Sequence, residues 1–315
     1  MLSILATTFP FFALVLAGYA ATRRGLLPVS AIAGLNSFVL YFALPCMLYR
    51  FGSQTPVAQL LDPRVAAVYL ASGVLMVLGT VAATRARWGW NDAAFGALVA
   101  AFPNSGFMGV PLLVALLGEA SAGTVIPTMA LDMIVTSSLC VALSRLSLGE
   151  GSAGRALRLA LAGVLANPLP WSIALGGLAS AASFELPGPL EQTVAMLAAA
   201  ASPVALFTIG AVLARSQMNH AEAVAPRDYV PVALAKLLVH PLLVWLGCQL
   251  ARLAGWPLPP LAETTLVLVA ALPSASNVSL LAERFEAHGG RVARIILVST
   301  ALAFLSFSAA VALLT

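Results

Sequence analysis

The sequence predicts an all-α polytopic membrane protein in which ten transmembrane helices form two inverted halves, residues 1–150 and 151–315. Three observations lead to this fold class. Hydrophobic residues make up 61% of the chain and charged residues only 9%, whereas about a quarter of an ordinary soluble domain is charged. Arginines gather in alternate loops, and proline motifs recur at matching places in the two halves. We therefore expect the chain to fold in a lipid bilayer.

Ten apolar segments follow one another along the chain, separated by Gly, Pro and clusters of charge. Each is close to the roughly 20 residues that a helix needs to cross a bilayer. Because together they use nearly the whole sequence, no linker or soluble domain is expected. Arg23 and Arg24 follow the first segment, which is the reverse of a signal peptide, so this segment is counted as a span. The segments are residues 2–22, 31–51, 64–84, 92–117, 123–146, 156–181, 189–214, 229–252, 261–284 and 290–314.

The basic residues predict the orientation of these segments. Most arginines lie after odd-numbered segments, few lie after even-numbered ones, and Lys236 falls inside the eighth segment. By the positive-inside rule, both termini are expected to face away from the cytoplasm. The first group is Arg23, Arg24, Arg85, Arg87, Arg145, Arg155, Arg158, Arg215, Arg227, Arg284, Arg291 and Arg294, and the second group is Arg50, Arg64 and Arg252.

Matching motifs indicate that the second half of the chain repeats the first. Residues 43–45 (Ala-Leu-Pro) in the second segment correspond to residues 201–203 (Ala-Ser-Pro) in the seventh. Residues 101–103 (Ala-Phe-Pro) in the fourth correspond to residues 271–273 (Ala-Leu-Pro) in the ninth. Because each half has an odd number of spans, the second half inserts upside down. Interrupted helices at matching places of an inverted repeat are typical of a transport site.

The fourth and ninth segments are both expected to be broken helices. Residues 102–111 contain two Pro, two Gly and an Asn, and residues 272–279 contain one Pro, three Ser and an Asn. Proline removes a backbone donor and clashes with the preceding turn. In lipid the freed backbone groups need new partners, so such breaks indicate a function, whereas a lone proline such as Pro10 indicates only a kink. In inverted halves the two breaks should face each other and cross.

The two breaks form the candidate substrate site. A half-helix that begins at a break presents unpaired N–H groups and a partial positive charge, which favour an anion. Asn and Ser side chains add donors and acceptors, and neither break contains Arg or Lys. A carboxylate would therefore be held by backbone and amide donors. The candidate substrate-binding residues are Pro103, Asn104, Ser105, Gly106, Gly109, Pro111, Pro273, Ser274, Ser276 and Asn277.

Two charged residues lie well inside predicted spans, Asp132 in the fifth and Lys236 in the eighth. A charge inside the membrane is costly and indicates a function by default. Asp132 could take a proton or coordinate Na⁺, and Lys236 could replace a coupling cation or attract the substrate. Alternatively, the two residues pair with each other, or with backbone at the breaks, and only hold helices together. His240 is interpreted as a packed or backbone-bonded residue.

Several other functions lack the residues they would need. The net charge of +4 comes from small basic groups between apolar runs, so no nucleic-acid partner is expected. Three distant cysteines have no metal-ligand spacing, so no metal or other cofactor is expected. There is no His-Glu-x-x-His motif, and Asp132 alone cannot supply a catalytic dyad. The sequence therefore favours a carrier of a small organic anion, while an intramembrane enzyme, a channel or a sensor are the competing hypotheses. The cysteines are Cys46, Cys140 and Cys248.

Residues 103–111 (Pro-Asn-Ser-Gly-Phe-Met-Gly-Val-Pro) resemble the fourth-helix signature of the auxin efflux carrier family, which contains bacterial malonate and malate permeases and plant auxin exporters. The resemblance covers essentially the whole chain. The long cytoplasmic loop of many plant members is absent, so the chain is similar to the compact bacterial form and is expected in a bacterial cytoplasmic (inner) membrane. Further similar stretches are residues 44–45, 167–168, 203–210, 236–241 and 273–277.

The resemblance implies the elevator fold of bile-acid/sodium symporter and NhaA-like relatives. In that fold, helices 1, 2, 6 and 7 form a scaffold that also makes a homodimer. Helices 3–5 and 8–10 form a mobile transport domain, with the crossed helices 4 and 9 at its centre and Asn104 as a substrate contact. The implied function is secondary active transport of a mono- or dicarboxylate. An exporter of an auxin-like aromatic carboxylate or an amino-acid metabolite is the alternative, and coupling to Na⁺, to H⁺ or to no ion stays open.

Overall fold

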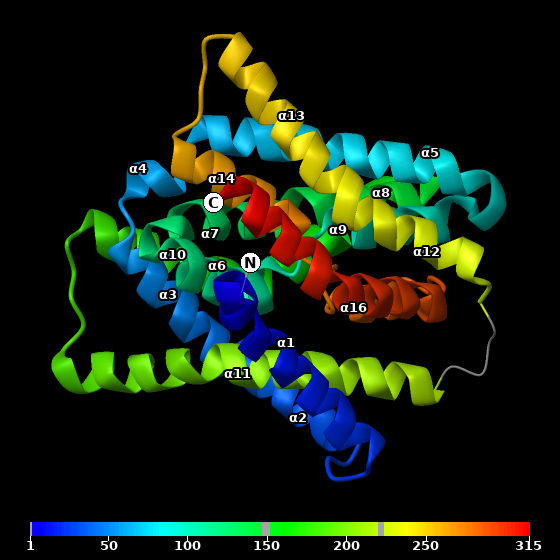
Figure 1. Cartoon of the computed structure of the whole chain (residues 1–315), viewed down its shortest axis with the longest axis horizontal. Helices are drawn as coiled ribbons and strands as arrows, with labels where there is room; N and C mark the ends of the chain where they lie inside the picture. Colours follow the sequence, from blue (N-terminus) through cyan, green and yellow to red (C-terminus); the bar gives the residue numbers. More distant parts are fainter. Residues whose placement is uncertain (1, 147–151, 220–223) are drawn as a thin grey trace. The chain divides into compact units, whose positions relative to one another are not determined.

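The computed structural model describes residues 2–146, 152–219 and 224–315. All regular secondary structure in these ranges is helical, and a single isolated β-bridge joins Pro103 to Ser274 (Figure 1). The prediction of an all-α protein is therefore confirmed.

Six helical stretches of the described chain are long and apolar enough to cross a membrane. Two shorter apolar stretches, Ser105–Leu117 and Pro260–Ala271, lie beside the two predicted breaks. The predicted count of ten spans in two inverted halves stays a prediction. The six stretches are Ala31–Gln54, Val57–Ala101, Glu119–Ser144, Gly188–Met218, Pro226–Leu253 and Gly289–Leu314.

The chain forms two compact units, and each unit contains segments from both halves of the sequence. The first unit comprises Met1–Asp62, Ser105–Pro127 and Leu165–Asn219, and the second comprises Pro63–Asn104, Thr128–Val164 and His220–Thr315. The helices of the first unit are α1 (Leu2–Arg23), α2 (Ala31–Phe38), the π-helix η1 (Val39–Ala43), α3 (Leu44–Gln54), α4 (Val57–Leu60), the π-helix η2 (Ser105–Gly109), α6 (Val110–Leu117), the 3₁₀-helix η3 (Glu119–Ser121), most of α7 (Ala122–Leu131), α10 (Pro168–Ala181) and α11 (Gly188–Asn219).

The helices of the second unit include two further π-helical turns, η4 and η6, each inside a longer helical stretch. The elements are α5 (Pro63–Ala101), η4 (Asp132–Thr136), α8 (Ser137–Ser144), α9 (Ser152–Leu165, whose last residue belongs to the first unit), α12 (Pro226–Leu234), η6 (Ala235–Val239), α13 (His240–Leu253), α14 (Pro260–Ala271), α15 (Val278–Arg284) and α16 (Gly289–Leu314).

Glycine brings α1 and α11 into backbone contact in the first unit, where the two helices cross (Figure 1). A Cβ atom at Gly18 would lie 1.9 Å from the carbonyl oxygen of Phe207, and one at Gly210 would lie 1.8 Å from that of Val15. Small residues at such a crossing let two backbones approach closely, which is a common way for membrane helices to associate. No side chain other than hydrogen fits at either position without moving a helix.

The pair formed by α3 and α10 is packed in the same way. A Cβ atom at Gly176 would lie 2.6 Å from the carbonyl oxygen of Tyr49, and one at Gly52 would lie 3.2 Å from the Cα atom of Gly176. At the end of this crossing the Ser180 hydroxyl donates a hydrogen bond to the carbonyl oxygen of Thr55, at 2.8 Å. The first unit therefore contains two glycine-lined helix crossings.

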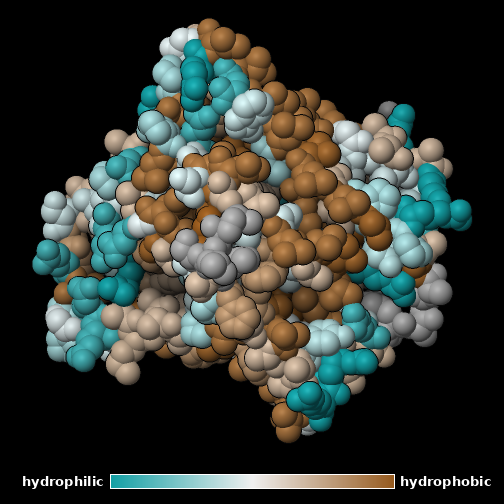
Figure 2. Space-filling model, in the orientation of Figure 1, coloured by the Kyte–Doolittle hydropathy of each residue, from teal (hydrophilic) through white to brown (hydrophobic). Residues whose placement is uncertain are grey.

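In the second unit, α5 changes direction at Gly89, whose φ of 71° lies in the left-handed region that favours glycine. This bend separates the third predicted span from the start of the fourth. Helix α13 packs against α5 and α14. Figure 2 shows apolar atoms along α13, and the exposed residues of this helix include Leu242, Trp245 and Leu250. A helix that exposes large apolar side chains suits a lipid environment.

The glycine crossing of α1 with α11 predicts that Gly210→Ala destabilises the protein. The added methyl group would overlap the Val15 carbonyl, and overpacking of this kind costs about 1–3 kcal/mol. We expect the midpoint of thermal unfolding of the detergent-purified protein to fall by several degrees. Gly34→Ala is the control, because its Cβ would meet no atom within 4 Å. Equal unfolding temperatures for the two variants would contradict the close approach.

Candidate functional site

The two predicted breaks lie side by side in the second unit. Residues 102–104, which follow α5, run antiparallel to residues 273–275, which follow α14. The Asn104 N–H donates to the carbonyl oxygen of Pro273 at 2.8 Å, and the Ala275 N–H donates to that of Phe102 at 3.0 Å. These two bonds flank the bridge between Pro103 and Ser274. Two interrupted helices thus exchange the backbone hydrogen bonds that each has lost.

The prolines suit this crossing because the pairing does not use their nitrogen atoms. Pro273 takes part only through its carbonyl oxygen, and Pro103 makes neither of the two bonds. Proline breaks the helical ladder without leaving an N–H group unpaired in a buried place. The break and the crossing are therefore consequences of the same residues.

The side chains at the crossing are buried, and one of them has no partner. Asn104 is 4% exposed and Ser274 is fully buried. The Ser274 hydroxyl has no hydrogen-bond partner in the described part of the chain. Ser276 is buried beside them, whereas Asn277 is exposed and does not cap α15. Unpaired polar groups in a buried place indicate that another molecule completes their bonds.

The remaining candidate residues follow directly in the chain and belong to the first unit. Ser105, Gly106 and Gly109 form the π-helix η2, and Pro111 is the second residue of α6. The Ser105 hydroxyl is buried and has no hydrogen-bond partner among the described residues. Short π-helical turns inside a helix are frequent at functional sites. The second unit thus brings together six of the ten candidate residues. These are Pro103, Asn104, Pro273, Ser274, Ser276 and Asn277.

Asp132 is a buried carboxylate held by two hydroxyl groups. It begins the π-helix η4 and is 1% exposed. Its Oδ2 atom accepts a hydrogen bond from the Tyr69 hydroxyl at 2.6 Å, and its Oδ1 atom accepts one from the Thr136 hydroxyl at 2.9 Å. No group of three His, Cys, Asp or Glu side chains in the described ranges is arranged to hold a metal ion. Asp132 is therefore a single carboxylate in a hydroxyl-lined environment.

Lys236 lies in the π-helix η6 and is fully buried, and its ammonium group reaches the end of α14. Its Nζ atom donates to the carbonyl oxygen of Ala270 at 2.7 Å and lies 3.1 Å from Nδ1 of His240. Because Ala270 lies in the last turn of α14, the positive charge faces the negative end of that helix dipole. The His240 Nε2 atom is buried and has no partner in the described chain.

The role of Asp132 and Lys236, as an ion-coupling site or as a charge pair, stays a prediction. In the described part of the chain the two side chains form no hydrogen bond or ion pair with each other. The carbonyl oxygen of Ala270 takes the ammonium group instead. Bonding to backbone at a break was the other structural alternative, and Lys236 does this one turn before Pro273.

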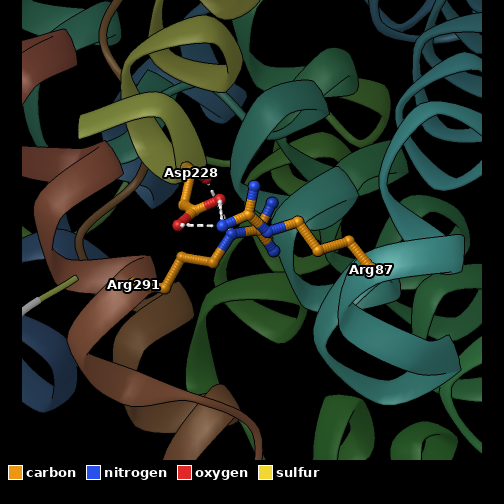
Figure 3. Close-up of polar contacts among 3 residues, drawn as sticks. All are labelled: Arg87, Asp228 and Arg291. Carbon is orange, nitrogen blue, oxygen red and sulfur yellow. Dashed lines mark hydrogen bonds and ion pairs between the residues drawn. The ribbon is translucent and has the colours of Figure 1, made fainter. Parts of the chain in front are cut away.

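Sequence reasoning missed a second polar cluster in this unit, shown in Figure 3. Arg291, 1% exposed, donates to the carbonyl oxygens of Asp228 and Asp92, both at 2.9 Å. Its guanidinium group lies over the ring of Trp88. The carboxylate of Asp228 pairs with Arg87 at 3.0 Å. From the sequence, Arg87 and Arg291 were interpreted only as residues that set the membrane orientation. In the structure they join the bend of α5 to the starts of α12 and α16.

The long apolar helices are those of an integral membrane protein, and comparison with known proteins identifies a transport protein and its family. The model of the family described as "Membrane transport protein" matches residues 3–311. The chain belongs to this family, which is the auxin efflux carrier family. The resemblance carried by residues 103–111 is therefore confirmed.

Several relatives share most or part of the sequence. A protein of Rhizobium meliloti (strain 1021) named "Putative malonate transporter" is 29% identical over 308 residues, which cover 96% of this chain and 93% of the relative. An uncharacterized transporter of Methanothermobacter thermautotrophicus is 27% identical, with 95% of each chain covered. Auxin efflux carrier component 7 of Arabidopsis thaliana is 28% identical over 142 residues, 44% of this chain and 22% of the relative. These names indicate a transporter rather than an enzyme.

The surroundings of Asp132 predict that Asp132→Asn changes how transport depends on pH or Na⁺. Asparagine can still bond to Tyr69 and Thr136, but it carries no charge and cannot exchange a proton. The measurement is carboxylate flux in proteoliposomes under imposed pH and Na⁺ gradients. Glu191→Gln, an exposed change in the first turn of α11, is the control. An unchanged ion dependence of the Asp132→Asn variant would leave Asp132 with a structural role.

Proposed function

We propose that this protein is a secondary active transporter that carries a small organic anion, such as a mono- or dicarboxylate, by an elevator-type alternating-access mechanism. The observation that carries the proposal is the crossing in the second unit, where the Asn104 side chain is buried and the Ser274 hydroxyl is buried without a partner in the described part of the chain. The name of the Rhizobium relative supports a dicarboxylate such as malonate as the first substrate to test.

The chemistry of the crossing suits a carboxylate that must be bound and then released. Amide and hydroxyl groups donate hydrogen bonds to carboxylate oxygens. Neither residues 102–105 nor residues 272–277 include Arg or Lys. A bidentate arginine would bind the anion more strongly. Neutral donors hold the carboxylate less tightly, so it can be released after transport. Lys236 adds a positive charge through its bond to the carbonyl of Ala270, three residues before Pro273, without taking part in the backbone pairing.

The proposal extends to ion coupling. The ammonium group of Lys236 occupies the negative end of α14, which is a place where a transporter could otherwise hold a coupling cation. A fixed positive charge there would remove the need for Na⁺. Asp132 is the buried carboxylate that could take a proton, and Tyr69 and Thr136 hold it in place. We therefore propose H⁺ rather than Na⁺ as the coupling ion.

The helix pairs of the first unit support the proposed inverted repeat. In a five-plus-five repeat, the first segment corresponds to the sixth, and the second corresponds to the seventh. The crossing of α1 with α11 would then be equivalent to that of α10 with α3, and both are lined by glycines. The first unit contains the first, second and seventh segments and the sixth from Leu165 onward, and the second unit contains the third, eighth and tenth. This division supports a scaffold and a transport domain. Ser105–Pro127 departs from this division. It covers the second part of the fourth segment and the start of the fifth, which were expected in the transport domain, but it falls in the first unit.

We place this transporter in a bacterial inner membrane as a homodimer formed through its scaffold helices, with both termini outside the cytoplasm. The arginine distribution supports the orientation. Thiol-reactive labelling of single cysteines introduced beside the termini, from either side of the membrane, would test it.

The crossing predicts that Asn104→Ala weakens substrate binding by about tenfold or more while the protein still folds and inserts. Removing a hydrogen bond to a charged ligand costs about 1.5–3 kcal/mol, or roughly tenfold or more in affinity. The measurement is the thermal shift of the purified protein with malonate, other mono- and dicarboxylates and an indole carboxylate, each with and without Na⁺. Asn36→Ala on α2 is the control, and normal binding by the Asn104→Ala variant would exclude the crossing as the site.

A further inference from the structure

Ser299 connects the crossing to α16. It is fully buried, and its hydroxyl oxygen accepts a hydrogen bond from the Ser274 N–H at 3.2 Å. The same hydroxyl donates to the carbonyl oxygen of Ile296, one turn earlier on α16, at 3.0 Å. A single side chain thus ties the backbone at the second break to a neighbouring helix.

The geometry of the crossing explains why Ser274 needs this partner. The two backbone bonds lie on either side of the Pro103–Ser274 bridge and use the N–H groups of Asn104 and Ala275. In such an antiparallel pair, the bridged residues direct their own backbone groups away from the partner strand. Pro103 has no N–H group to satisfy, but Ser274 has one, and it is buried. The two breaks are therefore unequal, and Ser299 meets the additional requirement of the second.

The second hydrogen bond of Ser299 fixes the direction of its lone pairs. Because the hydroxyl hydrogen points to the Ile296 carbonyl, the oxygen is left to accept from Ser274. This arrangement holds the Ser274 backbone at a defined distance from α16. The Ser274 backbone is thus held on one side by Ser299 and on the other by the bonds of its neighbours Pro273 and Ala275 to the first break. This fixes the position of the Ser274 hydroxyl, which has no partner in the described chain.

We propose that Ser299 is a positioning residue for the substrate site: it holds the Ser274 backbone so that the Ser274 hydroxyl faces the bound carboxylate. The proposal rests on the function proposed above. Ser299 itself does not touch the substrate. Binding groups must be held within about 0.5 Å of their productive geometry. The donors at this crossing are neutral, so no strong charge–charge attraction would maintain affinity if the Ser274 hydroxyl were displaced.

The test compares three variants of the full-length protein, Ser299→Ala, Ser299→Thr and Ser144→Ala. Ser144 is a matched control, because it is also buried and its hydroxyl also bonds to a carbonyl three residues earlier, that of Val141. It makes no contact with the crossing among the described residues. The probe is malonate, measured by binding to the purified protein and by uptake into proteoliposomes.

We expect Ser299→Ala to raise the Kd and the KM for malonate by about tenfold, a loss typical of a misplaced binding group, with little change in kcat. Ser299→Thr keeps the hydroxyl and should stay within about twofold of the wild type, and Ser144→Ala should bind as the wild type does. Wild-type affinity in the Ser299→Ala variant, or an equal loss in the Ser144→Ala variant, would overturn the proposal.

Hydrogen exchange of the unliganded protein separates this proposal from the proposed function. Loss of the Ser299 hydroxyl should speed exchange of the Ser274 amide by about tenfold or more relative to Ser144→Ala. Faster exchange with unchanged malonate affinity would overturn the positioning role and leave a structural one. A wild-type protein that binds no carboxylate would overturn the proposed function and the substrate role of Ser299 with it. The exchange result would still decide whether Ser299 holds Ser274.

Discussion

The rest of the structure depends on one constraint, which is that a backbone polar group inside a membrane must find its partner within the protein. Two proline-containing stretches interrupt helices, and they satisfy one another by pairing, with Asn104 bonded to Pro273 and Ala275 bonded to Phe102. The extended crossing is thus the form that the backbone takes when two helices are broken at the same place. A polar site arises there because such a crossing holds amide and hydroxyl side chains away from both lipid and water.

The same constraint determines where the buried cations go. Lys236 bonds to the carbonyl oxygen of Ala270, and Arg291 bonds to the carbonyl oxygens of Asp228 and Asp92. In both cases a main-chain acceptor takes the place that a carboxylate would have in a buried ion pair. Because Lys236 bonds to a carbonyl oxygen, the carboxylate of Asp132 is bonded to the hydroxyl groups of Tyr69 and Thr136 and forms no salt bridge in the described part of the chain.

The sequence was sufficient for features that are local along the chain. Long apolar runs predict helices, prolines beside Asn and Ser predict the two breaks, and isolated charges in apolar runs single out Asp132 and Lys236. The repeat predicted that the two distant breaks meet, but individual side-chain partners distant in the chain could not be predicted, because no spacing rule links them. The bond from Tyr69 to Asp132 joins residues 63 positions apart, and Ser299 is one of many serines in apolar segments.

The two units differ in the kind of polar group that they bury. Every buried charged side chain in the described ranges belongs to the second unit, whereas the buried polar side chains of the first unit are hydroxyls. Most of these hydroxyls bond to a carbonyl three or four residues earlier in their own helix, as Thr22 does to Gly18 and Thr208 to Val204. The helices of the first unit therefore pack mainly by shape, through glycine crossings, and their buried hydroxyls are satisfied mostly within their own helices. The second unit depends on particular long-range bonds, and so it is the unit in which single polar substitutions should alter chemistry rather than packing alone.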